Sequence, residues 1–120
     1  MPYKFTRERF GLYRRFWGEV SEEEFLESIN LVQARPDFDE IRYSIIDLSD
    51  VDSIAITEWA FEWAGAMSFG AAKANPNISI ALVTPSEVIA KLAPHFVSPY
   101  QLRIFTKLED ARRWIEERLS

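Results

Sequence analysis

Short apolar segments typical of strands alternate with segments typical of helices along most of this chain. The segment from Ile78 to Val83 is apolar on both sides, as expected of a central strand with helices on both faces of its sheet. Near the N-terminus, two segments can pair as an antiparallel hairpin that turns near Phe10 and Gly11. This alternation predicts an α/β layer fold, and the hairpin makes the predicted sheet mixed. The predicted strands are Tyr3–Arg7, Leu12–Trp17, Ile41–Ile46, Ile78–Val83 and Leu102–Phe105.

The predicted helices are marked by their starts. Ser21 and Glu24 form a capping box, in which the serine hydroxyl accepts from the Glu24 amide and the Glu24 carboxylate accepts from the Ser21 amide. Similar patterns begin at Thr84 and Thr106, and a longer helix is predicted over Thr57–Ala74. The expected order is therefore β-β-α-β-α-β-α-β-α, in a single domain of 120 residues.

The composition argues against several classes of function. The chain is 48% hydrophobic, so it can bury a core without disulfides, and it has no cysteine. Its net charge of -5 argues against nucleic-acid binding, which requires a concentrated basic face. No apolar run reaches the roughly 20 residues of a membrane span. The first residues carry charges where a signal peptide would be apolar, so we expect a cytoplasmic protein.

An acidic segment follows the strand Ile41–Ile46, and α/β folds usually place function at such a strand end. We expect this segment to be a turn in which Asp47 accepts from backbone amides. We predict no calcium loop here, because apolar residues interrupt the acidic ones and no glycine allows the sharp bend. The candidate regulatory or partner-binding loop comprises Asp47, Ser49, Asp50, Asp52 and Thr57.

We expect neither an enzyme nor a cofactor or metal site. The sequence has no glycine-rich phosphate loop and no nucleophile elbow. Its only histidine, His95, lies where a helix is expected to end. An acid, a base and a nucleophile cannot be assembled from these residues.

Four arginines gather in the predicted hairpin, namely Arg7, Arg9, Arg14 and Arg15. The simplest interpretation is a strand face that lies in solvent. The alternative is a site for an anion or a lipid headgroup.

The predicted helix Thr57–Ala74 is apolar on two faces, which a helix in one small core does not need. The stripe predicted to face the core comprises Trp59, Ala60, Trp63, Ala64, Met67 and Ala71. The opposite stripe comprises Phe61, Gly65, Phe69 and Ala72. Either neighbouring elements cover this second stripe, or it meets a partner. The simplest partner is a second copy of the chain in a homodimer.

The pattern of the chain resembles the STAS fold of sulphate transporters and anti-sigma-factor antagonists. The resemblance is carried by the segment Ile45–Val51, by Tyr13–Val20 with the helix start that follows it, and by the ending Ala111–Ile115. The chain is most similar to the SpoIIAA-like branch, which is grouped with the lipid-binding lobe of Sec14/CRAL-TRIO proteins. The resemblance covers nearly the whole chain and implies a SpoIIAA-like α/β fold.

The resemblance implies a non-enzymatic regulatory domain that binds a protein partner or itself. In anti-sigma-factor antagonists an Asp-Ser-Ser-Gly turn opens the second helix, and a partner kinase phosphorylates its first serine. The segment Ala55–Glu58 stands at that place and lacks the aspartate, the phosphorylated serine and the glycine. Thr57 matches the second serine, and we expect it to be the helix N-cap.

The alternative function is a small carrier of an apolar or lipid ligand, as the relation to Sec14 implies. Its pocket would be formed by Trp59, Phe61, Trp63, Met67 and Phe69.

Overall fold

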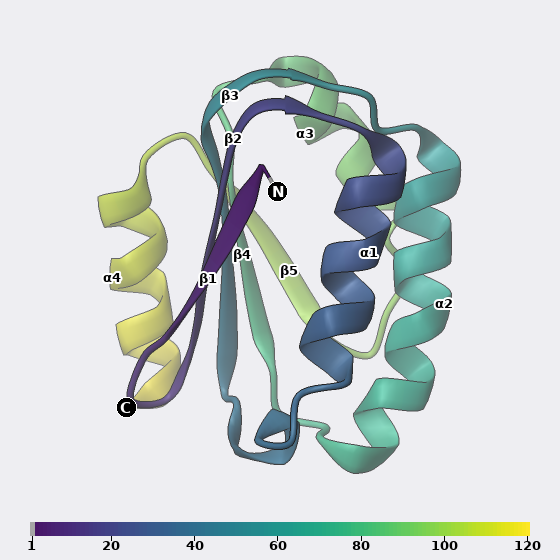
Figure 1. Ribbon diagram of the computed structural model, residues 1–120. Coiled ribbons are helices and arrows are strands. Elements are labelled where there is room, and N and C mark those ends of the chain that lie inside the picture. The colour runs from purple at the N-terminus through teal and green to yellow at the C-terminus, as the bar shows by residue number, and fades with distance from the viewer. Residues whose placement is uncertain (1) are drawn as a thin grey trace.

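A five-stranded mixed sheet forms the middle layer of the molecule (Figure 1). The computed structural model describes residues 2–120. The strands lie in sequence order across the sheet, with β1 antiparallel to β2 and every other pair parallel, which confirms the predicted hairpin and mixed sheet. The strands are β1 (Tyr3–Arg7), β2 (Gly11–Val20), β3 (Tyr43–Ile54), β4 (Ser79–Val83) and β5 (Gln101–Phe105).

Helices cover both faces of this sheet (Figure 1). Three of them lie on one face, and α4 lies on the other. The predicted order of strands and helices is confirmed, and two short 3-10 turns, Phe38–Glu40 and Ala93–His95, are added to it. In residues 2–120, no helix combines the length and the apolar character that a membrane crossing requires. The helices are α1 (Glu22–Gln33), α2 (Glu58–Ala74), α3 (Glu87–Leu92) and α4 (Leu108–Leu119).

Two adjacent isoleucines of β3 belong to two different cores. Ile45 packs in the cluster beneath α4, which includes Ile115. Ile46 packs in the larger cluster beneath the other helices, which includes Phe61. Successive side chains of a strand point to opposite faces, so a strand that is covered on both sides must be apolar at every position.

Of the three predicted capping boxes, one is present and two are not. The Ser21–Glu24 capping box is present in full. The N-cap of α3 is Ser86, whose hydroxyl accepts from the Ile89 amide, whereas Thr84 accepts from the amide of Ser86 and does not begin the helix. α4 begins after Lys107, and no side chain caps it. The boxes predicted at Thr84 and Thr106 are therefore wrong, because the polar side chain at Thr84 forms a local turn instead.

β3 continues through the acidic segment that was predicted to be a turn. Beyond Asp47 this strand no longer pairs with β4, but it stays paired with β2 as far as Ile54. Two irregularities in register occur there, and Gly18 adopts a positive φ of 66°. The prediction of a turn is wrong because the backbone groups of the acidic residues are satisfied by β2. Figure 1 shows β2 and β3 bending together over the helical layer before they enter α1 and α2.

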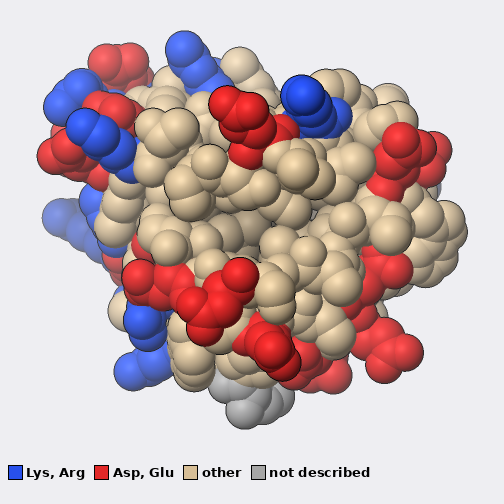
Figure 2. Space-filling view, turned by 90° about the horizontal axis from the view of Figure 1, so that it is seen from above, with Lys and Arg blue, Asp and Glu red and all other residues tan. Residues whose placement is uncertain are grey.

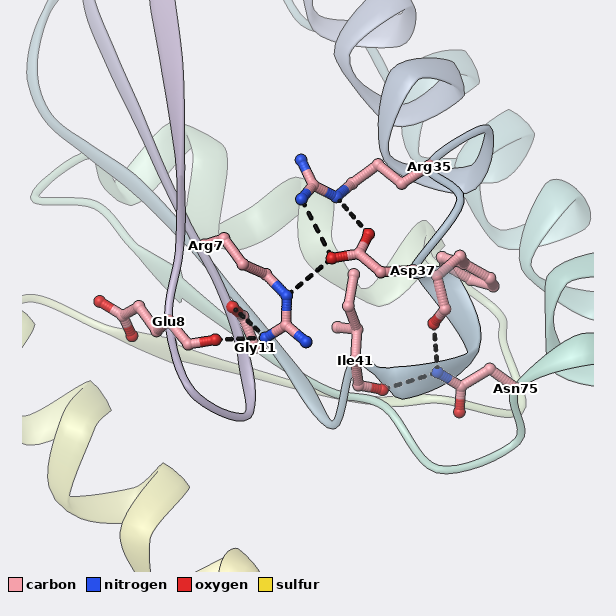
Figure 3. Close-up of polar contacts among 8 residues, drawn as sticks. Arg7, Glu8, Gly11, Arg35, Asp37, Ile41 and Asn75 are labelled. Atoms are coloured by element: carbon pink, nitrogen blue, oxygen red, sulfur yellow. Dashed lines mark hydrogen bonds and ion pairs between the residues drawn. The ribbon is translucent and has the colours of Figure 1, made fainter.

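Buried polar contacts lock the opposite end of the sheet (Figure 3). The side-chain amide of Asn75, at the end of α2, donates to the carbonyl oxygens of Phe38 and Ile41 at 2.8 and 2.6 Å. The Tyr100 hydroxyl donates to the Asn75 carbonyl at 2.5 Å. These bonds join the end of α2 to the segments that lead into β3 and β5.

Two arginines bind one carboxylate beside this contact (Figure 3). Asp37 accepts from Arg7 and from Arg35, each at 2.8 Å. The hydrogen bonds from Arg35 and Arg7 lower the pKa of Asp37 to about 2. The hairpin is thereby connected to the segment that follows α1.

Candidate functional site

Asp47 is the last residue of β3 that pairs with β4, and it is buried. Its carboxylate accepts from the Ser49 amide at 3.0 Å, as predicted, and also from the Tyr13 hydroxyl. Burial, with a smaller contribution from the hydrogen bond to Asp47, raises the pKa of Tyr13 to about 12. The two side chains are therefore engaged with each other.

The other acidic residues of the candidate loop lie on the paired extension of β3. Asp50 forms an exposed ion pair with Arg15 of β2, at 2.9 Å. Ser49 and Asp52 are exposed beside it. Residues 2–120 bring together no group of three acidic or histidine side chains suited to a metal ion. The exposed residues Ser49, Asp50 and Asp52 of the loop therefore offer a hydrogen-bonding surface.

Thr57 takes the N-cap position of α2 but does not cap it. Its hydroxyl donates to Glu22, in the first turn of α1, at 2.6 Å, and its amide donates to the same oxygen at 3.0 Å. Thr57 therefore occupies the predicted N-cap position, but its hydroxyl contacts Glu22 and does not cap the helix. The pair connects the starts of the two helices.

The inward face of α2 differs from both predicted stripes. Phe61 is only 3% exposed and lies 6.4 Å from the Phe25 ring, measured between centroids. Trp59 and Phe69 are 56% and 53% exposed, and Trp63 is half-buried. The assignment of Trp59 to the core is therefore wrong. Of the two alternatives for the opposite stripe, neighbouring elements cover Phe61 and Gly65, whereas Phe69 is exposed. The buried face runs through Ala60, Phe61, Ala64, Gly65 and Ser68.

Small side chains set the orientation of α2, because another segment passes very close to them. A Cβ atom on Gly65 would lie 2.4 Å from the carbonyl oxygen of Val97. One turn farther along, the Ser68 hydroxyl donates to that of Ser98 at 2.6 Å. A pattern of apolarity alone cannot detect this constraint, because glycine and serine contribute little to it. Gly65 and Ser68, two small residues one turn apart, are the sequence signal that could have indicated the buried face of α2.

The outer face of α2, defined here by Trp59, Trp63 and Phe69, therefore carries large aromatic side chains toward solvent. Of the five residues predicted to line a ligand pocket, Phe61 alone lines the cavity described below. His95 lies beside the start of the helix, with its Nε2 atom 3.6 Å from Glu58. The residues predicted to form one apolar pocket are thus separated: Phe61 lies in the core, whereas Trp59 and Phe69 lie on the surface.

A groove of about 330 Å³ lies at the carboxyl ends of β3 and β4. Its lining includes Leu48, Val51, Ile54 and Ile89, together with the exposed Val88 of α3. Figure 2 shows this face of the molecule, where a mostly uncharged centre has both acidic and basic side chains around it. The position is the one that α/β folds commonly use for binding.

A polar hollow of about 500 Å³ lies at the other end of the sheet, beside the end of α4. Arg42 and Arg118 line it, and Arg118 donates to the Ser79 hydroxyl at 2.6 Å. It is open and contains no carboxylate side chain among its lining residues.

A smaller cavity of about 80 Å³ lies between the sheet and α1 and α2. Arg14 lines it and is only 4% exposed, so the prediction of a solvated arginine face is wrong for this residue. Arg14 points inward because it lies two residues from Leu12 and from Phe16, on the same face of β2, and both of these are fully buried. This spacing can be read from the sequence. Arg7, Arg9 and Arg15 are exposed.

The Arg14 guanidinium is held by hydroxyl groups and aromatic rings. Nη2 donates to Ser28 at 2.8 Å, and Nη1 makes a long contact of 3.4 Å with Ser44. The guanidinium carbon lies 5.4 and 5.9 Å from the ring centroids of Phe5 and Phe16. Burial lowers the pKa of Arg14 to about 10, which leaves it charged at neutral pH.

Known structures share this architecture. The anti-sigma factor antagonist SpoIIAA in its unphosphorylated form matches with a TM-score of 0.64 and 12% identity, over 95% of this chain and 97% of that one. The phosphorylated form of the Bacillus cell fate determinant SpoIIAA matches with a TM-score of 0.57 and 14% identity, over 93% and 98%. An uncharacterised protein of the DUF3478 family from Shewanella loihica PV-4, with a SpoIIAA-like fold, matches with a TM-score of 0.56 and 19% identity, over 94% and 91%.

At these identities the structural matches establish the fold alone. A comparison with curated proteins finds no match. The SpoIIAA-like family model, however, matches residues 12–116, which is most of the sequence. The chain therefore belongs to the SpoIIAA-like family.

Proposed function

We propose that this chain is a non-enzymatic regulatory domain that binds a protein partner through the outer face of α2. The observation that carries the proposal is the exposure of Trp59 and Phe69. More than half of the surface of each residue is accessible to solvent. Exposed apolar groups of this size on one element usually mark an interface, and tryptophan is enriched among residues that dominate binding energy. The relatives described as anti-sigma factor antagonists also act on a protein.

The charges around this face indicate what the partner must offer. Glu58 and Glu62 are exposed on the same helix, and the whole chain carries a net charge of -5. A partner with an apolar pocket and basic groups at its rim would complement both features. The exposed Ser49, Asp50 and Asp52 would extend the polar rim beyond the start of the helix.

The contact between Thr57 and Glu22 argues against control by phosphorylation at this helix start. A phosphate on Thr57 would lie against the Glu22 carboxylate that its hydroxyl now contacts, with Glu58 next to it in sequence. Like charges at such a distance oppose the modified state. We therefore expect the partner-binding surface to be available without a phosphorylation step.

The test compares proteins captured from the native host by wild-type chain and by two variants. Trp59→Ser should lose the partner, whereas Leu31→Ser, which removes an exposed apolar side chain from α1, should retain it. Capture of the same proteins by both variants in equal amounts would contradict the proposal. Analytical ultracentrifugation of the purified chain identifies the case in which the partner is a second copy, because Trp59→Ser would then shift a dimer to a monomer.

A further inference from the structure

Arg14 is a buried charge that no carboxylate of residues 2–120 neutralises. Its side chain forms no ion pair within the described part of the chain, and its Nε atom is buried with no hydrogen-bond partner there. The two hydroxyl contacts and the two aromatic rings leave most of the five N–H donors of the guanidinium unused. Buried arginines are normally paired, since an isolated buried charge is destabilising.

Arg14 lines the cavity between the sheet and the helices. The polar part of the lining is small and comprises Arg14, Gln33, Ser44 and Ser68. The remainder is aliphatic or aromatic, and Phe61 and Ile80 are part of it. The lining thus combines one cationic side chain and three uncharged polar ones with walls that are mostly apolar.

We propose that this cavity binds a short-chain monocarboxylate, such as propionate, with its carboxylate on Arg14. The Nη1 group, whose contact with Ser44 is long at 3.4 Å, keeps an N–H that can donate to a carboxylate oxygen in a charge-assisted hydrogen bond. The hydroxyl of Ser44, which lies within reach of the same guanidinium, can donate to that carboxylate. The alkyl chain would lie against the apolar walls.

The size of the cavity limits the ligand to a few carbon atoms. Its volume is about 80 Å³, whereas an apolar cavity of roughly 150 Å³ is needed to hold benzene. A long acyl chain does not fit in this volume. An inorganic anion would fit, but it would leave the apolar walls without a contact.

The test is an NMR titration of the whole chain at pH 7 with sodium propionate, with sodium chloride and neutral propionamide as parallel titrants. Propionate should give saturable shifts at backbone amides beside the cavity, including those of Ser44 and Ala64. Neither chloride nor propionamide should bind with comparable affinity. Equal binding of chloride would assign a general anion site and overturn the proposal, as would equal binding of propionamide or no saturable binding of propionate.

Two variants remove the site in different ways. Arg14→Met removes the charge and should weaken propionate binding by about tenfold or more. It is expected to fold, because an apolar side chain of similar volume usually replaces an unpaired buried charge without loss of stability. Ala64→Leu keeps Arg14 and fills the cavity from α2, so it should also abolish binding. Arg15→Met, on the solvent-exposed side of the same strand, should bind as the wild type does. Unchanged binding by Arg14→Met or by Ala64→Leu would overturn the proposal.

Discussion

The Thr57 hydroxyl donates to the Glu22 carboxylate at 2.6 Å and joins the start of α2 to the start of α1. We predict that Glu22→Ala lowers the free energy of unfolding by about 1 kcal/mol, because a charge-assisted hydrogen bond is lost at a site that water partly screens. Urea denaturation measures the change. Glu23→Ala, which removes an exposed acidic residue from the same helical turn, should lower stability less; an equal loss would show that the contact with Thr57 contributes nothing.

Two glycines of α2 are predicted to respond in opposite directions to alanine. Gly65→Ala should destabilise the fold by about 1–3 kcal/mol, because its new methyl group would meet the Val97 backbone at 2.4 Å. Gly70→Ala should stabilise it by about 0.4–1 kcal/mol, because nothing lies within 4 Å and alanine restricts the unfolded chain. Thermal unfolding of both variants compares them directly. Similar behaviour at the two positions would contradict the close approach of residues 96–99 to the helix.

The two phenylalanines of α2 should differ strongly in their contribution to stability. Phe61→Ala should cost about 3–5 kcal/mol, because the ring is buried in the main core. Phe69→Ala should change the free energy of unfolding by at most about 1 kcal/mol, because more than half of the residue is exposed. Chemical denaturation of the two variants measures both values. A large cost at Phe69 would mean that a second element covers the outer face.

The contact between Glu8 and Arg112 predicts a dependence of stability on pH. The hydrogen bond from Arg112 lowers the pKa of Glu8 below its ordinary value of 4.5. A carboxyl group whose pKa falls on folding stabilises the native state above its unfolded pKa, and that contribution disappears as the pH falls through its folded pKa. We expect Glu8→Gln to lose about 1 kcal/mol at pH 7 and to differ less from the wild type near pH 3. An identical difference at both pH values would exclude this origin.

The sequence predicts the layers of this fold because local signals and burial agree there. Ser21 and Glu24 form the predicted capping box, and the apolar run around Ile45 and Ile46 forms the predicted strand covered on both faces. The fold class follows from such elements, since each needs only its own residues to be recognised.

The prediction fails where a segment distant in the sequence determines the conformation or the orientation of an element. The acidic residues after Asp47 remain in a strand because β2 pairs with them, and α2 is oriented by the passage of Val97 over Gly65. Arg14 differs from the other arginines of the hairpin, because it shares the buried face of β2 with Leu12 and Phe16. The sequence therefore predicts the fold better than it predicts the candidate site. The residues of a site depend on which face of each element is covered, and distant segments determine that.

The most direct test of the proposed function is the affinity of the captured partner for purified variants, measured by isothermal titration calorimetry. If the outer face of α2 is the binding surface, Trp59→Ser should raise Kd by about 30-fold or more, as expected for a residue that dominates an interface. Leu31→Ser should leave Kd unchanged within about threefold. Equal affinities of the wild type and Trp59→Ser would contradict the proposal.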